Sequence, residues 1–544
     1  MAHQSHSAHG ENPIHLPPGV NAKDFSDALK QFEAAVGKEW VFTSDEDLAL
    51  YRDAYSPLWG DAEDSIPSAA LAPDTVEQVQ AIARIANQLS IPLYTISTGR
   101  NLAYGGSAPV LNGSVVLDLK RMNRVLEVSE KNAFALVEPG VSYFDLYRHI
   151  RDKGLKLWID CPEPGWGSLI GNAVDRGAGS TPLPYRDHYE AHCGMEVVLA
   201  NGEVVRTGMG ALPTAQTWQQ FKFGCGPFMD GIFSQSNFGI VTKMGFWLYP
   251  EPEACLVGRA RVPHHDDIIP FIDILANLMY SGVINTHFAV RSPVFNGPPD
   301  PEKTALDVKD ASPAEWNRYA ASKNLNFWQT DLHFYGPAKV VAAQWEHVRD
   351  RLSAIAGATF EDVATYRFPL TDEQIANFTD KGAVGIPSLA VFGSMRFLQA
   401  DVPVTGHLDI SPIIPANGAE ILKARKVFAG VFREMGVVPQ NGYPETFHWR
   451  AFIMFHGLPV THDPKVNAKS RAAYEKMVEV AAANGWGFYR THIAFMDKVV
   501  NTYSYNQHSL LRLHETVKDA LDPNGILSAG RYGIWPKHLR RQKA

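Results

Sequence analysis

The stretch TISTGRNLAYGGSAP, residues 95–109, lies between two strand-like runs at 91–96 and 114–119 and combines glycines with an arginine and an asparagine. Glycine adopts positive φ readily and lets the backbone approach a ligand closely. Successive backbone N–H groups in such a loop can bind an anion such as a phosphate. The stretch has neither the Gly-Lys-Ser/Thr of a P-loop nor a G-x-G-x-x-G turn. Taken alone, it fits both an anion-binding loop and an ordinary glycine-rich turn.

The composition is that of a large globular protein. The chain has 544 residues, 45% of them hydrophobic and 20% charged, and a net charge of -8. That length corresponds to roughly three domains, which large enzymes often merge into two. The acidic balance argues against a nucleic-acid partner, and the absence of a run of about 18 apolar residues predicts no membrane span. Four cysteines without C-x-x-C spacing, and no signal segment, predict free thiols and a cytoplasmic protein.

The N-terminal half predicts short strands alternating with helices. Residues 1–20 are polar and rich in histidine, and we expect a flexible tail. From about 66 to 250, strand-like runs alternate with helical pieces, and GMEVVLANGEVVRTG predicts a hairpin that turns at Asn201-Gly202. The pattern predicts an α+β domain rather than a regular βαβ repeat.

The second half changes character after residue 250. Longer helices are predicted at 268–281, 337–355, 418–435 and 467–484. Residues 295–315, rich in proline and charge, are expected to form a long polar loop. A final segment, 486–544, contains a helix at 507–521. We therefore predict domains at 21–250 and 251–485, followed by this C-terminal segment.

Six motifs follow one another along the chain, which are TGRNLAYGG, EPGV, PEPGWGSLIGN, CGMEVVLANGEVVRTG, FSQSNFGIVTK and DPNGILSAGR. In this order and spacing, from about residue 60 to 537, they resemble the vanillyl-alcohol oxidase/p-cresol methylhydroxylase flavoprotein family, in its 4-alkylphenol or eugenol oxidase branch. It implies a two-domain α+β fold. An FAD-binding domain would form from 21–250 and the returning segment 486–544, and a cap domain, 251–485, would cover the flavin.

The resemblance also assigns residues to the cofactor. In such flavoproteins the opening loop winds round the FAD pyrophosphate, and a second glycine-rich stretch contacts the flavin from the other side. The FAD-binding residues implied are Ser97, Thr98, Gly99, Arg100, Asn101, Gly105, Gly106, Gly167, Ser168, Gly171, Asn172, Ile240 and Arg531.

Three further residues are implied to hold the substrate. In the family, a tyrosine at the position of Tyr104 acts with a Tyr-Arg pair, here Tyr489 and Arg490, on the oxygen of a para-substituted phenol. Two O–H donors and a guanidinium favour the phenolate, because each stabilises the charged form. The phenolate would then release a benzylic hydride to flavin N5 and form a para-quinone methide. Each tyrosine taken singly would fit ordinary packing.

Glu163 is the implied acid or base. The family carries an acidic residue, usually aspartate, at this position near flavin N5. Glu163 would help water add to the quinone methide, or protonate it. Its side chain is one methylene longer than aspartate, and Pro164 follows it. A loop carboxylate at the surface is the alternative.

His407, in VTGHLDISPI, resembles the histidine that family oxidases bond covalently to the flavin 8α methyl group. The dehydrogenase branch uses a tyrosine in this role and passes electrons to a cytochrome subunit, so His407 favours the oxidase branch. One family feature is missing, because the early region that can carry flavinylation histidines reads YSPLWGDAED.

Three residues are assigned to the substrate pocket. Ser180 stands where the family commonly has a tyrosine, Asp409 stands where relatives carry an aromatic or small residue, and Trp449 lies in a predicted pocket wall. A lost ring would enlarge the cavity, and a buried carboxylate must be paired or wet. These changes predict a bulkier or more oxygenated phenol than vanillyl alcohol.

The sequence therefore predicts an FAD-dependent oxidase of para-substituted phenols that uses O2 and makes H2O2, in a homodimer or larger homo-oligomer. A dehydrogenase coupled to a cytochrome and a non-catalytic flavin carrier are the alternatives. The missing G-x-G-x-x-G turn disfavours a nicotinamide dehydrogenase. No metal site is expected, because H-E-x-x-H and Cys/His ligand spacings are absent.

Overall fold

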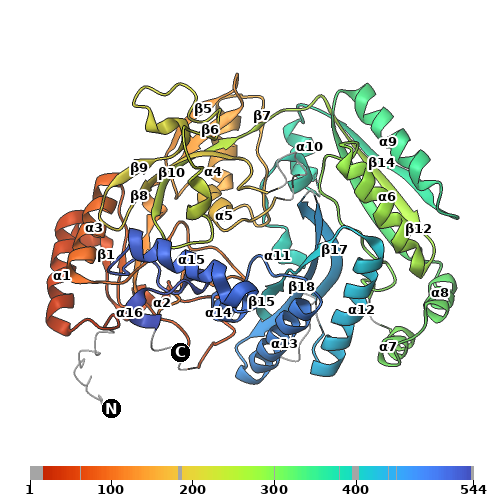
Figure 1. Cartoon of the computed structure of the whole chain (residues 1–544). Helices are drawn as coiled ribbons and strands as arrows, with labels where there is room; N and C mark the ends of the chain where they lie inside the picture. The colour runs from red at the N-terminus through yellow and green to blue at the C-terminus, as the bar shows by residue number, and fades with distance from the viewer. Residues whose placement is uncertain are drawn as a thin grey trace, which may run out of the picture.

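The computed structural model describes residues 16–61, 63–179, 181, 187–298, 300–378, 380–394, 404–438, 440–448 and 450–540. It has the predicted α+β architecture, with two groups of sheets and their helices side by side (Figure 1). Most of the predicted tail, 1–20, lies outside the described residues. The cysteines are free thiols, as predicted. Within the described part of the chain, no helix has the length and apolarity that a membrane crossing requires.

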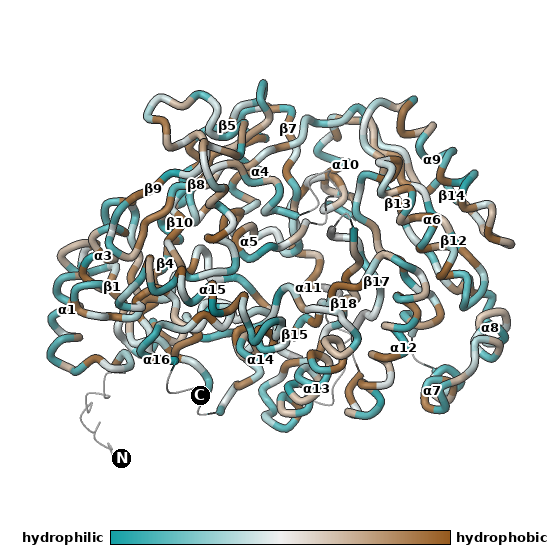
Figure 2. Tube along the Cα trace, in the orientation of Figure 1, coloured by the Kyte–Doolittle hydropathy of each residue, from teal (hydrophilic) through white to brown (hydrophobic). Residues whose placement is uncertain are grey.

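The first sheet has the order β1-β2-β4-β3 and pairs β4 with both β2 and β3 in parallel. Its strands are β1 (Val41–Phe42), β2 (Ala70–Leu71), β3 (Leu93–Ile96) and β4 (Val115–Asp118). Helices α1 (Ala22–Val36) and α3 (Val76–Leu89) pack on it, and Phe25 and Phe32 of α1 are buried. Figure 2 shows both hydrophilic and hydrophobic segments along α1, as expected for a helix with one buried face.

The second sheet is antiparallel, in the order β5-β6-β10-β8-β9. Its strands are β5 (Val125–Ser129), β6 (Phe134–Val137), β8 (His192–Val198), β9 (Val204–Arg206) and β10 (Ile240–Trp247). The β8–β9 hairpin turns at Asn201-Gly202, where Gly202 has φ 80°, so this prediction is confirmed. Helices α4 (Tyr143–Asp152) and α5 (Leu169–Val174) lie between β6 and β8 in the chain.

Two further antiparallel sheets follow residue 250. The first places β12 (Ala254–Val262) between β13 (Trp328–Gly336) and β14 (Thr359–Arg367). In the second, β18 (Ala451–Thr461) pairs with its three neighbours, which are β15 (Val404–Ile410), β16 (Ile413–Pro415) and β17 (Gln440–His448). The change of sheets falls where the sequence places a domain boundary.

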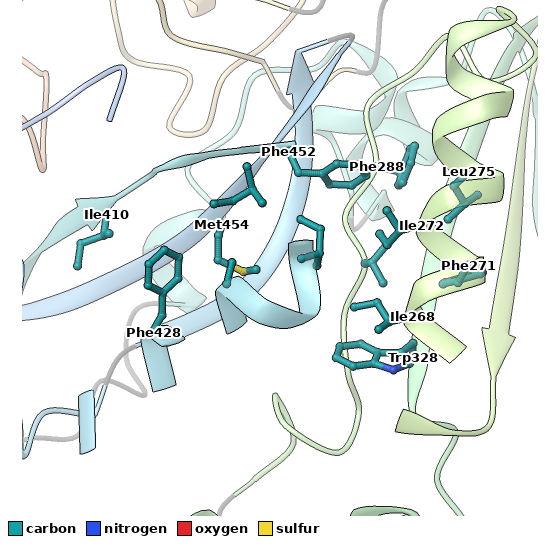
Figure 3. Close-up of a cluster of buried hydrophobic side chains, with 14 of the residues drawn as sticks. Ile268, Phe271, Ile272, Leu275, Phe288, Trp328, Ile410, Phe428, Phe452 and Met454 are labelled. Carbon is teal, nitrogen blue, oxygen red and sulfur yellow. The ribbon is translucent and has the colours of Figure 1, made fainter. Parts of the chain in front are cut away.

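Long helices cover these sheets and share one core with them. The helices are α6 (Ile268–Tyr280), α9 (Ala338–Leu352), α12 (Gly418–Met435) and α13 (Pro464–Ala483), all close to their predicted spans. Figure 3 shows Phe271 and Leu275 of α6 near Phe288 and Trp328, with Phe428 of α12 farther along the same cluster. Burial of large aromatic and aliphatic side chains fixes how α6 and α12 lie against the strands.

The predicted polar loop at 295–315 is wrong. This stretch contains α7 (Pro301–Val308) and the start of α8 (Pro313–Ser322). Asp300 and Ser312 cap the two helices, and a proline occupies the first turn of each. Proline is favoured at the first helical position, because its missing N–H would have no partner there.

The C-terminal segment returns to the first sheet. Leu93 N–H of β3 donates to Ile526 O at 2.7 Å, and Ser528 N–H donates to Leu93 O at 2.7 Å. Lys518 of α15 (Tyr505–Leu521) is fully buried and donates to Asp522 and to the carbonyl of Asn237. In Figure 1, α15 lies in front of the elements from the N-terminal half. The contacts agree with a returning segment, and the exact domain boundaries stay a prediction.

Gly418 tests the packing of α12 against α6. A Cβ at Gly418 would lie 2.4 Å from the carbonyl oxygen of Ile269, so Gly418→Ala must push the two helices apart. We expect a loss of about 1–3 kcal/mol in the free energy of unfolding, measured with urea. Gly430→Ala in the same helix meets no atom within 4 Å and is the control. It should stabilise by about 1 kcal/mol, because alanine has the higher helix propensity. Equal effects of the two changes would contradict this packing.

Candidate active site

The opening loop closes on itself through the backbone of Asn101. Asn101 O accepts hydrogen bonds from the N–H groups of Tyr104 and Gly106, both at 3.1 Å. Gly99 and Gly106 have φ of 66° and 54°. A Cβ at Gly99 would lie 2.1 Å from Ser107 Oγ, so glycine is required there.

This loop forms one wall of a cleft between the two sheets of the N-terminal half. Of the residues predicted to bind the cofactor, the cleft is lined by Ser97, Thr98, Gly99, Arg100, Asn101, Gly106, Gly167, Ser168, Gly171, Asn172 and Arg531. The structure thus brings together two motifs and a C-terminal arginine that are distant in the sequence. The Ser168 hydroxyl caps α5 through Gly171 N–H, which fixes the second wall.

Three predicted cofactor residues do not line this cleft. Gly105 packs against Ile493, and Ile240 is buried in the core while its neighbours Gly239 and Val241 line the cleft. His407 lies on β15. The stretch 234–239, expected on the adenine side of the cofactor, contributes Ser236, Asn237 and Gly239 to the lining of the cleft. The Asn237 amide donates to the carbonyls of Ser528 and Ile534.

A buried carboxylate, Asp175, organises the end of the cleft. Its Oδ2 accepts from Arg490 Nε and Asn101 Nδ2, both at 2.8 Å. Its Oδ1 accepts from Arg531 at 2.9 Å and from the Tyr532 hydroxyl at 2.6 Å. Burial alone would raise the pKa of Asp175, but Arg490 and Arg531 outweigh it, so the pKa lies below its usual value.

Arg490 joins this network to Tyr104. A second nitrogen of Arg490 donates to Asn101 Oδ1 at 2.8 Å, and its Cζ lies 3.8 Å from the centre of the Tyr104 ring. Burial and the nearby Asp409 carboxylate raise the pKa of Tyr104 well above its usual value, although Arg490 opposes them. Burial likewise raises the pKa of Tyr489 to about 12. Both phenols therefore keep their protons at neutral pH and can act as donors.

Asp409 and His407 lie side by side on β15. His407 Nε2 is 3.2 Å from Asp409 Oδ1, and the ring of Tyr55 is 5.4 Å from the His407 ring, centre to centre. Both side chains are buried. His407 Nδ1 has no hydrogen-bond partner among the residues that the structure describes. After burial, the Asp409 carboxylate is the next cause of the raised pKa of Tyr104.

Glu163 is half-buried in the loop before α5. Burial, and then the neighbouring Asp380 carboxylate, raise its pKa. It is not among the residues that line the cleft. Ser180 and Trp449, predicted for the substrate pocket, lie outside the described residues.

Sequence reasoning missed Asp175 and Tyr532, and it placed Gln235 only within the stretch 234–239 on the adenine side of the cofactor. Gln235 donates to the carbonyl of Tyr489 at 2.9 Å and to the Tyr532 hydroxyl at 3.1 Å. The one signal for Asp175 was its position directly after the GNAV stretch. An acidic residue at the end of a buried glycine-rich helix needs a cationic partner.

Comparisons of the sequence and of the fold find similar proteins of known activity. Residues 67–208 match the model of an FAD binding domain, and residues 455–532 match the C-terminal domain of FAD linked oxidases. The chain is 33% identical to the 4-cresol dehydrogenase [hydroxylating] flavoprotein subunit of Pseudomonas putida, over 96% of this chain and 98% of that protein. It is 36% identical to 1'-carboxy-chondrochloren decarboxylase of Chondromyces crocatus, over 95% and 99%. The structure of 4-ethylphenol oxidase from Gulosibacter chungangensis in its isoeugenol complex superposes with a TM-score of 0.83, at 35% identity over 96% of this chain and 100% of that one.

The chain belongs to the vanillyl-alcohol oxidase/p-cresol methylhydroxylase family. It is an FAD-linked oxidoreductase, and the predicted family, fold class and cofactor are confirmed. The residues present fit FAD. Gly99 and Gly171 leave no room for a Cβ, and the lining combines loop backbone and small polar residues, which can approach a diphosphate, with the cations Arg100 and Arg531.

Asp175→Asn tests whether this carboxylate holds the site together. The change leaves the buried Arg490 and the partly buried Arg531 without a counter-charge, so we expect a loss of ~3–5 kcal/mol in the free energy of unfolding at pH 7. Because the folded pKa of Asp175 is lowered, its contribution is complete above the ordinary aspartate pKa, about 3.9. It is lost as the pH falls further, through the folded value. Urea unfolding of the parent and of Asp175→Asn at pH 7, and at pH values below about 3.9, measures both statements.

Glu479→Gln is the matched control for Asp175→Asn. Glu479 pairs with Lys498 at 2.6 Å, but both side chains are exposed. Its loss should cost about 1 kcal/mol or less. If Asp175→Asn lowered the free energy of unfolding by as little as Glu479→Gln, the role given to Asp175 would be contradicted.

Proposed function

We propose that this enzyme oxidises para-substituted phenols at the benzylic carbon. The substrates would be 4-hydroxybenzylic alcohols and 4-alkyl- or 4-allylphenols, including methoxylated phenols of the lignin type. The observation that carries the proposal is the group formed by Tyr104, Tyr489 and Arg490, with Arg490 stacked on Tyr104 and bonded to Asp175. The names of two relatives, a 4-cresol dehydrogenase and a 4-ethylphenol oxidase, support the same substrate class.

The group favours the ionised form of a bound phenol. Arg490 is a permanent cation, and Tyr104 and Tyr489 keep their protons because their pKa values are raised. A phenolate oxygen beside them gains charge-assisted hydrogen bonds that a neutral phenol lacks. The negative charge delocalises to the para carbon and weakens the benzylic C–H bond toward hydride loss. The substrate loses its phenolic proton and a hydride and becomes a para-quinone methide.

When bound, FAD supplies the acceptor for that hydride. Water addition to the quinone methide gives a benzylic alcohol, and loss of a proton gives an alkene. A 4-hydroxybenzylic alcohol gives the aldehyde instead. Glu163 is proposed as the acid or base for these proton movements, since burial and then the Asp380 carboxylate raise its pKa above the ordinary value. Asp409, Ser180 and Trp449 are proposed to shape the substrate pocket, with Asp409 as its polar acceptor.

We further propose that O2 is the electron acceptor, which makes the enzyme an oxidase that produces H2O2. The support is His407, which the family's oxidases use for covalent FAD attachment. The alternative is a dehydrogenase that passes electrons to a cytochrome. The two relatives named above represent both activities at similar identity, 35% and 33%.

The surroundings of His407 support covalent attachment. Asp409 Oδ1 lies 3.2 Å from Nε2, and the buried Nδ1 has no hydrogen-bond partner among the residues that the structure describes. A neutral imidazole nitrogen without a hydrogen-bond partner is available as a nucleophile toward an electrophilic methyl carbon.

His407→Ala should make the flavin extractable by acid, whereas the parent protein should keep its yellow colour in the acid precipitate. The physical reason is the loss of the proposed bond to the 8α position. Absorbance of the supernatant and of the precipitate measures the effect. Complete acid release of FAD from the parent protein would rule out covalent attachment.

The para requirement tests the proposed reaction directly. Under anaerobic conditions, 4-hydroxybenzyl alcohol should bleach the flavin absorbance, and 3-hydroxybenzyl alcohol should not. Only the para isomer can delocalise phenolate charge to the benzylic carbon. Arg490→Gln should slow bleaching by about 100-fold, a loss of roughly 2.7 kcal/mol of transition-state stabilisation.

Arg367→Gln is the control for loss of an arginine charge. Arg367 is exposed and pairs with Glu253, so this change should leave the bleaching rate as in the parent. Equal bleaching by the meta and para isomers would contradict the proposed chemistry even if Arg490→Gln proved unstable.

A further inference from the structure

A row of buried polar side chains lies behind the cofactor cleft. His188 Nδ1 is 2.5 Å from Asn172 Oδ1 and 2.9 Å from the Tyr143 hydroxyl. On its other side, His188 Nε2 is 3.4 Å from Asp160 Oδ2. The side chains of His188 and Asp160 are 3% and 8% exposed, while Asn172 lines the cleft. The row therefore runs from a buried carboxylate to an amide that can reach a ligand.

The contacts determine which nitrogen of His188 carries a proton toward Asn172. An amide oxygen only accepts, so Nδ1 must donate to Asn172 Oδ1. Nε2 lies 3.4 Å from Asp160 Oδ2, too far and too poorly aligned for a hydrogen bond. Burial raises the pKa of Asp160, and the nearby His188 opposes this rise. The Asp160 carboxylate packs against this side of the ring and so helps to hold His188 in the orientation in which Nδ1 faces the Asn172 oxygen.

With its oxygen occupied, Asn172 presents donors to the cleft. Its NH2 group has no hydrogen-bond partner among the residues that the structure describes. Gly177 fixes the amide from behind, because a Cβ there would lie 2.2 Å from Asn172 Oδ1. The backbone of Gly177 also accepts the N–H of His188 at 3.0 Å. Rotation of the amide would break the contact with His188.

The position of Asn172 points to the redox-active end of the cofactor. Asn172 lies three residues before Asp175, which holds Arg490 at the end of the cleft. The isoalloxazine ring must approach that end if FAD is to receive electrons from a substrate held there. The pyrophosphate, in contrast, needs the backbone donors of the loop at 97–106.

We propose that Asp160 and His188 are positioning residues that hold the side-chain amide of Asn172 as a hydrogen-bond donor to the isoalloxazine of bound FAD. A donor at the ring stabilises the negative charge that two-electron reduction adds. The row therefore raises the reduction potential of the flavin. This inference requires that FAD binds but does not depend on the substrate. Its failure and the failure of the proposed phenol oxidation can therefore be distinguished.

The test is the reduction potential of the holoenzyme, measured anaerobically against a reference dye with a chemical reductant. His188→Phe keeps a ring against Tyr143 and removes both nitrogens. It should shift the equilibrium with the dye about tenfold toward oxidised flavin, which is about 30 mV for a two-electron couple. Asn172→Ala should shift it as far. The double variant should shift no further, because His188 acts only through Asn172.

Two more variants complete the design. Asp160→Asn should shift the reduction potential in the same direction as His188→Phe. It replaces His188→Phe as the test if that variant does not retain FAD. His192→Phe is the matched control, because His192 is also buried and pairs with Asp230 at 3.1 Å but does not line the cleft. It should leave the potential unchanged. Additive shifts in the double variant, or an unchanged potential in His188→Phe and Asp160→Asn, would overturn the inference.

Discussion

The charge on Asp175 is the interaction on which the rest of the site depends. This one carboxylate accepts hydrogen bonds from Asn101, Arg490, Arg531 and Tyr532. It joins the opening loop, the end of α5 and two places in the C-terminal segment. Buried arginines are tolerated only beside a counter-charge. Asp175 therefore stabilises both the position of Arg490 and the contact of Arg531 and Tyr532 with the N-terminal half.

The proposed substrate chemistry depends on the position of Arg490, which the contact with Asp175 fixes. Arg490 stays fixed because Asp175 and Asn101 occupy two of its nitrogens, and its face then lies against Tyr104. The residues of the cofactor loop and those of the proposed substrate group are therefore parts of one network. A carboxylate on the cap side, Asp409, adds negative charge near the same tyrosine and keeps it protonated. The proposed site thus combines the permanent cation of Arg490 with the neutral hydroxyl donors of Tyr104 and Tyr489.

Much of this could be predicted from the sequence. The helices at 268–281 and 418–435 were predictable, because apolar residues recur with helical spacing. Tyr104, Arg490 and the glycines of the cleft were proposed from motifs that follow one another in a specific order, and their roles stay a prediction. Local patterns could not reveal the partners of Asp175, since Arg490 is 315 residues away and only the fold brings them together. The loop expected at 295–315 shows the opposite failure, in which Pro301 and Pro313 begin helices instead of breaking them.

The ionisation state of a bound phenol tests the proposed roles of Arg490, Tyr104 and Tyr489 most directly. A phenol without a benzylic hydrogen, such as 4-cyanophenol, can be titrated into the oxidised holoenzyme while ultraviolet difference spectra are recorded across pH. We predict that the phenol binds as phenolate and that binding lowers its pKa by at least about one unit, or roughly 1.4 kcal/mol. A bound phenol that stays neutral at a pH above its free pKa would contradict the role of Arg490 and its tyrosines.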